Sequence, residues 1–293
     1  MKKGIVISAL LALLAFSTVG IWGDIFSAWD AIKGFSWWLI PLIAFFGFMN
    51  DMIKFLRWEL YLKKMEIQIP LKQSLVIFIS GLSMSATPGK VGMLIKSQMI
   101  KGLSGRSFLS STPVIAAELY MDLLGLSFIS LLAVGLFSKG IWVAMILCAL
   151  PLLGLIQGVA DRVIDLLARI PRLSDRAQEM RTAVDDMFGL FGMRTLGLAF
   201  AITLVAWTSE GVALHLILAG LGFHMDILTA TAVFGFSTLV GVLALLPGGL
   251  IVTDAGLMGL ITHTGIPATP AALATILARV FTINLAVLIG SIV

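Results

Sequence analysis

The sequence predicts an all-α polytopic membrane protein with about six spanning helices and two re-entrant helical hairpins in an inverted repeat. Three features carry this prediction. Of the 293 residues, 59% are hydrophobic and only 12% are charged, about half the charged share of a soluble domain. The apolar runs are about 20 residues long, the length that spans a bilayer as a helix. Two runs are interrupted by Pro-Gly, and a helix break at membrane depth needs shelter inside the protein.

The first part of the chain is predicted to contain two spanning helices. The apolar run at 4–21 resembles a signal peptide, but it lacks a convincing small-x-small cleavage site, so we favour an uncleaved helix. Residues 22–36 are rich in Trp, which is typical of an interfacial loop. The second helix is predicted from about 37 to 55, and residues 57–72 are expected to form a basic loop.

The first Pro-Gly break divides an apolar run into two arms, and each arm is too short to cross the bilayer as a helix. As a helix, residues 73–87 cover roughly 22 Å, less than the hydrocarbon core of about 30 Å. Pro88 and Gly89 then break the helix, and the second arm, 91–100, is shorter still. We interpret the two arms as a re-entrant hairpin. The alternative is one kinked spanning helix, which would move the following basic residues to the outer side.

The middle of the chain combines two apolar runs with a strongly charged stretch. Spanning helices are predicted at about 113–137 and 140–159. Residues 161–194 carry both charge signs and an apolar stripe, and Pro171 divides them into two short amphipathic helices. These helices either lie on the membrane surface or form a solvated linker; the sequence leaves both open. The single cysteine, Cys148, excludes an intrachain disulfide.

The last part repeats the succession of a spanning helix and a broken hairpin. A helix is predicted at 195–220, hairpin arms at 228–246 and 250–264, and a final helix at 270–293. The break consists of Pro247, Gly248 and Gly249. Because the sequence ends on apolar residues, a terminal truncation remains open.

The charge distribution predicts the topology. With the N-terminus inside, most of the 20 basic residues fall in inner loops, as the positive-inside rule expects. We therefore predict a multi-pass protein of the inner (plasma) membrane with a cytoplasmic N-terminus. The whole chain, 1–293, is predicted to be a single transmembrane domain in which the amphipathic segment 161–194 is cytoplasmic.

The two halves of the chain align on their breaks. Pro88 to Glu118 is 30 residues, and Pro247 to Arg279 is 32. Repeat one is predicted at about 57–137 and repeat two at about 207–293. The first hairpin enters from inside and the second from outside, so the halves are inverted repeats. Broken helices that meet at mid-depth in such repeats are a transporter architecture.

Charged residues near the breaks are the candidate substrate-binding site. Matching positions carry opposite charges: Lys96 corresponds to Asp254, and Glu118 to Arg279. An ion in hydrocarbon costs about 2.5–3.5 kcal/mol even on the insertion scale. We therefore expect these four residues to meet near the pseudo-two-fold centre. The full candidate set is Lys90, Lys96, Glu118, Asp122, Asp254 and Arg279.

The breaks also add helix N-termini to this site. Half-helices that begin at Val91 and Leu250 would expose N–H groups, which attract a lipid phosphate. The alternative is that the charged residues only pair with one another to hold the bundle together. Three polar residues of the second helix, Asn50, Asp51 and Lys54, are interpreted as interfacial and snorkelling.

Several short motifs occur in a fixed order along residues 37–290. They are Arg57-Trp58, Pro88-Gly89-x-x-Gly92 with Lys96, Glu118 with Asp122, Trp207-x-x-Glu210, Pro247-Gly248-Gly249-Leu250 with Asp254, Gly265-x-Pro267, and Arg279. The chain thereby resembles a flippase-like family that includes the transmembrane domain of lysylphosphatidylglycerol synthases. It departs from that family at two positions, where Asp254 replaces the usual Glu and Lys96 the usual Arg. The resemblance implies movement of lipids or lipid-linked sugars between leaflets; without a soluble catalytic domain, lipid aminoacylation is not expected.

The leading interpretation is a transporter or flippase for an anionic lipid or a lipid-linked substrate, either a polyprenyl-phosphate or a glycolipid. Alternatives are a membrane-embedded enzyme or glycosyltransferase partner acting on polyprenyl-phosphate lipids with the same carboxylates, or a passive scaffold. The lack of a His- or Cys-based catalytic pattern favours transport. Expected partners are a membrane lipid or lipid-linked sugar, with a glycosyltransferase or lipid synthase as further candidates, and no nucleic acid. No cofactor or metal is expected, because the three His are scattered.

Overall fold

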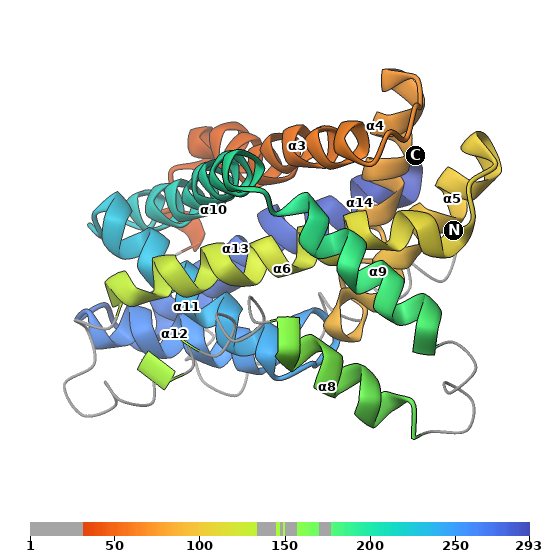
Figure 1. The fold of residues 1–293 in the computed structure, drawn as a ribbon. Helices are drawn as coiled ribbons and strands as arrows, with labels where there is room; N and C mark the ends of the chain where they lie inside the picture. The colour runs from red at the N-terminus through yellow and green to blue at the C-terminus, as the bar shows by residue number, and fades with distance from the viewer. Residues whose placement is uncertain (1–31, 134–144, 147–148, 150–156, 170–176) are drawn as a thin grey trace.

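Every regular element in the described part of the chain is a helix (Figure 1). The structure is a computed structural model that describes residues 32–133, 145–146, 149, 157–169 and 177–293. The predicted helix at 4–21 and most of the one at 140–159 lie outside these residues. Within the described part, four helices are long and apolar enough to cross a membrane: Trp37–Lys64, Phe108–Leu132, Met193–Gly220 and Ala268–Ile292. The prediction of an all-helical, multi-pass membrane protein is confirmed for this part.

Helix α3, Ile40–Lys64, follows a 3-10 turn and packs along α10, Met193–Gly220 (Figure 1). The sequence placed the end of α3 near residue 55 and a basic loop at 57–72, and this was wrong. The helix continues because Arg57 and Trp58 are buried, so the first basic residue here does not mark an exit to solvent. Asn50 Nδ2 donates to the carbonyl of Ala206 at 2.8 Å, which ties α3 to α10.

The first broken hairpin comprises α4, Leu71–Leu82, the 3-10 turn η2, Pro88–Leu94, and α5, Ile95–Ser104. Pro88 has no N–H to continue a helix. Gly89 and Lys90 both have a left-handed backbone, with φ of 57° and 56°. For a side-chain-bearing residue such as Lys90 this conformation costs roughly 1–3 kcal/mol, and such strain clusters at functional sites. Helix α6, Phe108–Ala133, follows.

The second broken hairpin has the same plan. Its parts are α11, Ile227–Leu243, the turn η6, Pro247–Gly249, and α12, Val252–His263. Asp226 caps α11 by accepting from the N–H of Thr229 at 2.9 Å. The chain then runs through α13, Ala268–Arg279, a π-helical segment η7, Val280–Asn284, and α14, Leu285–Ile292.

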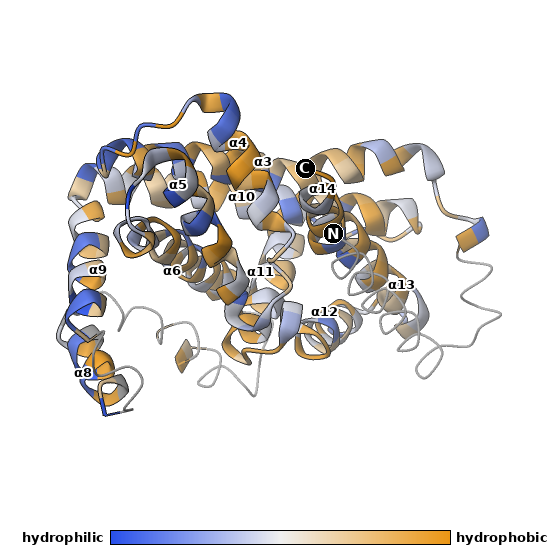
Figure 2. Ribbon diagram, turned by 90° about the vertical axis from the view of Figure 1, so that its right-hand side faces the viewer, coloured by the Kyte–Doolittle hydropathy of each residue, from blue (hydrophilic) through white to orange (hydrophobic). Residues whose placement is uncertain are grey.

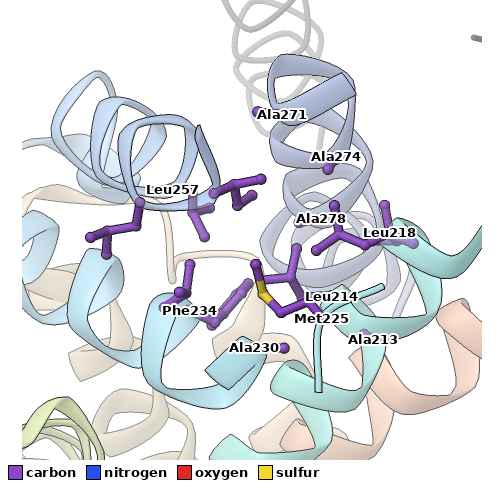
Figure 3. Packing of buried hydrophobic residues seen from close by; sticks show 14 of the residues in the cluster. Ala213, Leu214, Leu218, Met225, Ala230, Phe234, Leu257, Ala271, Ala274 and Ala278 are labelled. Carbon is purple, nitrogen blue, oxygen red and sulfur yellow. The ribbon is translucent and has the colours of Figure 1, made fainter. Parts of the chain in front are cut away.

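Each half of the chain packs a long apolar helix on the first hairpin arm of the other half. Helix α6 of the first half packs on α11 of the second, α14 of the second half packs on α4 of the first, and η2 contacts η6. Small side chains allow the close approach of helices in the second half: Ala271, Ala274 and Ala278 follow one another along α13, and Ala278 lies near Leu214 and Leu218 of α10 (Figure 3). The contact of η2 with η6 brings the two breaks together, with Gly249 buried and both Pro88 and Pro247 exposed.

The charged stretch forms two helices, α8, Gln157–Leu167, and α9, Ala177–Leu190, which lie on either side of residues 170–176. Both helices mix hydrophilic and hydrophobic residues (Figure 2). Helix α9 packs against α6, and Arg181 of α9 pairs with Asp161 of α8 at 3.8 Å and with Asp165. The predicted pair of short helices is confirmed, and α9 is docked on the bundle rather than forming a free linker.

Candidate functional site

A cavity of about 90 Å³ lies where the two breaks meet. Gly248 of η6 lies beside Ala86, just before η2, and Gly89 of η2 lies beside Leu245. Residues from α3, α10, α11 and α13 close the cavity. Its ionisable and amide-bearing lining residues are Asn50, Asp51, Lys54, Lys90, Glu210 and Arg279. The cavity therefore collects charged groups from both halves of the protein.

Asp122 of α6 holds three cations at one wall of this cavity. Its carboxylate lies 2.9 Å from Arg57 Nη2, 3.5 Å from Lys54 Nζ and 3.6 Å from Lys90 Nζ. Arg57 also donates to Thr203 Oγ1, and it is only 1% exposed. Asp122 does not neutralise the three cations by itself. The carboxylates of Asp51 and Glu210 also line the cavity, and when they are ionised they balance the remaining positive charge.

Trp207 of α10 provides an aromatic wall. Lys54 Nζ lies 3.7 Å from the centre of a Trp207 ring, which is a close cation–π contact. Lys54 is 7% exposed and Asn50 is 2% exposed, so the sequence interpretation of these residues as interfacial and snorkelling was wrong. They lie in the interior because α3 packs its polar face against α10, next to the breaks.

Arg279 forms the opposite wall, from the end of α13. Its Nε lies 3.1 Å from Asp254 Oδ1, and its Nη2 donates to the carbonyl of Gly248 in the second break. Asp254 also accepts from the N–H of Ile251 at 3.1 Å. The N-terminus of α12 is therefore already capped by the protein. The predicted starts of free half-helices at Val91 and Leu250 were wrong, because regular α-helix begins at Ile95 and Val252.

Lys96 and Glu118 form a separate pair away from the cavity lining. Lys96 is fully buried, and its Nζ donates to Glu118 Oε2 at 2.7 Å. The ammonium also lies 4.5 Å from the Trp58 ring centre and 4.6 Å from that of Phe78. The expected single cluster of Lys96, Glu118, Asp254 and Arg279 is thus divided into two pairs, each within one half. The Lys96–Glu118 geometry favours the structural alternative, a link between α5 and α6.

The Lys96 side chain lies directly against Gly81 of α4, and this contact can be tested with two Gly→Ala variants. A Cβ added to Gly81 would lie 2.7–2.9 Å from Lys96 Cγ, Cδ and Cε, whereas one on Gly102 would meet nothing within 4 Å. Replacing a helical Gly by Ala usually stabilises by about 1 kcal/mol. We expect Gly102→Ala to raise the thermal unfolding midpoint of the purified protein in detergent, and Gly81→Ala to lower it. A rise in both variants would contradict the described path of Lys96.

The structure distributes the six predicted site residues unevenly. Lys90 and Arg279 line the cavity, Asp122 and Asp254 hold the cations that line it, and the remaining pair lies elsewhere. Sequence reasoning did not select Asp51, Lys54, Arg57 or Glu210. For Glu210 a signal existed, because Trp207 and Glu210 are three residues apart and share a helix face. In the described part of the chain, no group of His, Cys, Asp and Glu side chains has the arrangement of a metal site.

These features define a polytopic helical membrane protein in which residues of two broken helical hairpins line a partly open, charged cavity. The chain belongs to the family described as the lysylphosphatidylglycerol synthase TM region, whose profile matches residues 3–290. A UPF0104 membrane protein of Methanothermobacter thermautotrophicus is 22% identical over 142 residues. That match covers 46% of this chain and 42% of the relative, so it spans less than half of the relative's length.

Proposed function

We propose that the protein is a flippase that moves an anionic lipid, or a lipid-linked substrate with a phosphate headgroup, between the two leaflets. One observation carries the proposal: Lys54, Lys90 and Arg279 converge on one partly open cavity at the contact between the two breaks. Cations at membrane depth are costly, and they mark substrate pathways.

Unpaired polar atoms in this region support a ligand. Among the described residues, Trp207 Nε1 and Arg57 Nε are buried donors without a hydrogen-bond partner. Buried polar groups are nearly always satisfied, so such exceptions call for an unseen partner such as water or a ligand. A phosphate offers acceptor oxygens that suit both an indole N–H and basic side chains.

The proposed mechanism uses both halves of the chain as inverted repeats. The broken hairpins are re-entrant, and they enter the bilayer from opposite sides. Rocking of one repeat against the other opens the cavity to each leaflet in turn, while the acyl tails remain in the bilayer. Reciprocal packing of α6 on α11 and of α14 on α4 is consistent with this pseudo-symmetry. We place the N-terminus and helices α8 and α9 on the cytoplasmic side of the inner membrane.

Arg279 is the residue whose loss tests the proposal. We expect liposomes containing the full chain to exchange a fluorescent phosphatidylglycerol between leaflets, measured by dithionite quenching of the outer leaflet. Arg279→Gln removes a cation from the cavity, and exchange should fall to the level of empty liposomes. Arg194→Gln removes the same charge from an exposed position at the start of α10, and exchange should be unchanged.

Two outcomes would contradict the flippase. Exchange that is equal in Arg279→Gln and in the unchanged protein would show that the cavity is not the path. Mass spectrometry of the recovered lipid provides the second criterion. A chemically altered lipid would support the alternative, a membrane-embedded enzyme that uses the same carboxylates.

A further inference from the structure

Glu210 enters the cavity from α10 without a partner among the described residues. It is 7% exposed, and its Oε2 accepts no hydrogen bond from them. Two carboxylates next to the cavity are paired: Asp122 holds three cations, and Asp254 holds Arg279 and accepts from the N–H of Ile251. Asp51 of α3 lines the cavity together with Glu210. Burial of a carboxylate without a hydrogen-bond partner is costly and favours its protonated form.

The four charged residues that line the cavity with Glu210 come from three elements. Asp51 and Lys54 of α3, Lys90 of η2 and Arg279 of α13 line the same cavity. Asp122 of α6 and Asp254 of α12 pair with these cations from behind. In the empty cavity the three cations favour an ionised Glu210, while its burial and the carboxylate of Asp51 favour the neutral form. An anion that binds to them removes this support and adds repulsion of its own.

Anion binding and protonation of Glu210 must therefore favour each other, because linkage between two ligands is reciprocal. We propose that Glu210 is a proton-binding site, which takes up one proton from water when an anionic headgroup enters the cavity. The neutral carboxyl then donates a hydrogen bond to a phosphate oxygen, and the proton leaves when the headgroup leaves. This inference rests on the proposed function, and it makes the transport of an anionic lipid proton-coupled.

Binding at different pH values tests the site directly. The probe is dihexanoylphosphatidylmethanol, a water-soluble phosphodiester with a single, permanently ionised acidic group, and the protein is the full chain in detergent micelles. As the pH is lowered from about 8 to about 6, the affinity should rise by up to about tenfold per pH unit, the limit for one linked proton. Glu210→Gln should bind the probe with an affinity that changes less with pH than that of the unchanged protein, because only Asp51 then remains as a cavity carboxyl group without a hydrogen-bond partner among the described residues. Glu179→Gln, an exposed change of the same kind on α9, should behave like the unchanged protein.

Infrared difference spectra on changing pH separate this inference from the proposed function. A protonated-carboxyl band that appears in the unchanged protein and is missing from Glu210→Gln identifies the proton site even without a lipid. If the probe binds but this band is absent, or both proteins show the same pH dependence, the inference is overturned and the flippase stands. If no protein binds the probe, the proposed function falls, and with it the coupling to an anion, while the band still decides whether Glu210 binds a proton.

Discussion

Removing either member of the Lys96–Glu118 pair is expected to destabilise the protein strongly, and removing both is not. Lys96 is fully buried and Glu118 is 3% exposed, with 2.7 Å between Nζ and Oε2. Breaking a buried pair leaves one uncompensated charge and costs about 3–5 kcal/mol, whereas replacing both ions by apolar groups of similar volume is often neutral. Lys96→Met and Glu118→Leu should each lower the unfolding midpoint, and the double variant should recover most of the loss.

Thermal unfolding of the four proteins in detergent gives the coupling by a double-mutant cycle. Simple addition of the two losses would show that the ions do not depend on each other. The same variants test whether Lys96 binds a headgroup. If the double variant is stable and still exchanges lipid, Lys96 and Glu118 have a structural role. If it is stable but does not exchange lipid, the pair belongs to the substrate site.

The second large effect is expected from a disulfide between the two breaks. A Cβ at Gly248 would lie 3.7 Å from Ala86 Cβ, and disulfides need a Cβ–Cβ distance of about 3.5–4.5 Å. In a Cys148→Ser background, Ala86→Cys with Gly248→Cys should therefore cross-link on oxidation. Locking η2 to η6 prevents the repeats from moving apart, so lipid exchange in liposomes should stop and return on reduction.

Each single cysteine variant is the control for this experiment. Gly248 has a φ of 59°, so its replacement introduces strain. That strain is present in the reduced double variant as well, and only the oxidised form should lose exchange. Full exchange in a completely oxidised double variant would show that transport needs no separation of the two breaks.

Several properties of the site were predictable from local sequence. Pro88 and Pro247 mark the breaks, because proline removes a backbone donor wherever it stands in a helix. The charged residues Lys90 and Arg279 stood out, because an ion in an apolar run needs an explanation. Both residues line the cavity. The partners of these cations were not predictable. Lys90 and Asp122 come together only because the chain forms α5 and then turns back along α6.

The interpretation of α3 shows where local reasoning fails. Lys54 and Arg57 follow an apolar run, and by sequence alone they mark the end of a spanning helix. In the structure α10 covers them, Asp122 pairs with both, and the helix continues to Lys64. The burial of Lys54 and Arg57 depends on α10, which begins more than 130 residues further along the chain. The sequence around these two residues therefore does not predict that they are buried.

The sequence by itself determined that this is a helical membrane protein and where its helices break, because hydropathy and the restricted backbone of Pro and Gly act within a few residues. Only the tertiary structure decided how the ions pair and which of them face the cavity. Matching positions in the two halves led to an expectation of pairs between the repeats, yet Lys96 binds Glu118 and Arg279 binds Asp254, each within its own half. The physical reason is that a buried charge is stabilised by whichever counter-charge packing brings within a few ångströms, and packing is a property of the whole bundle.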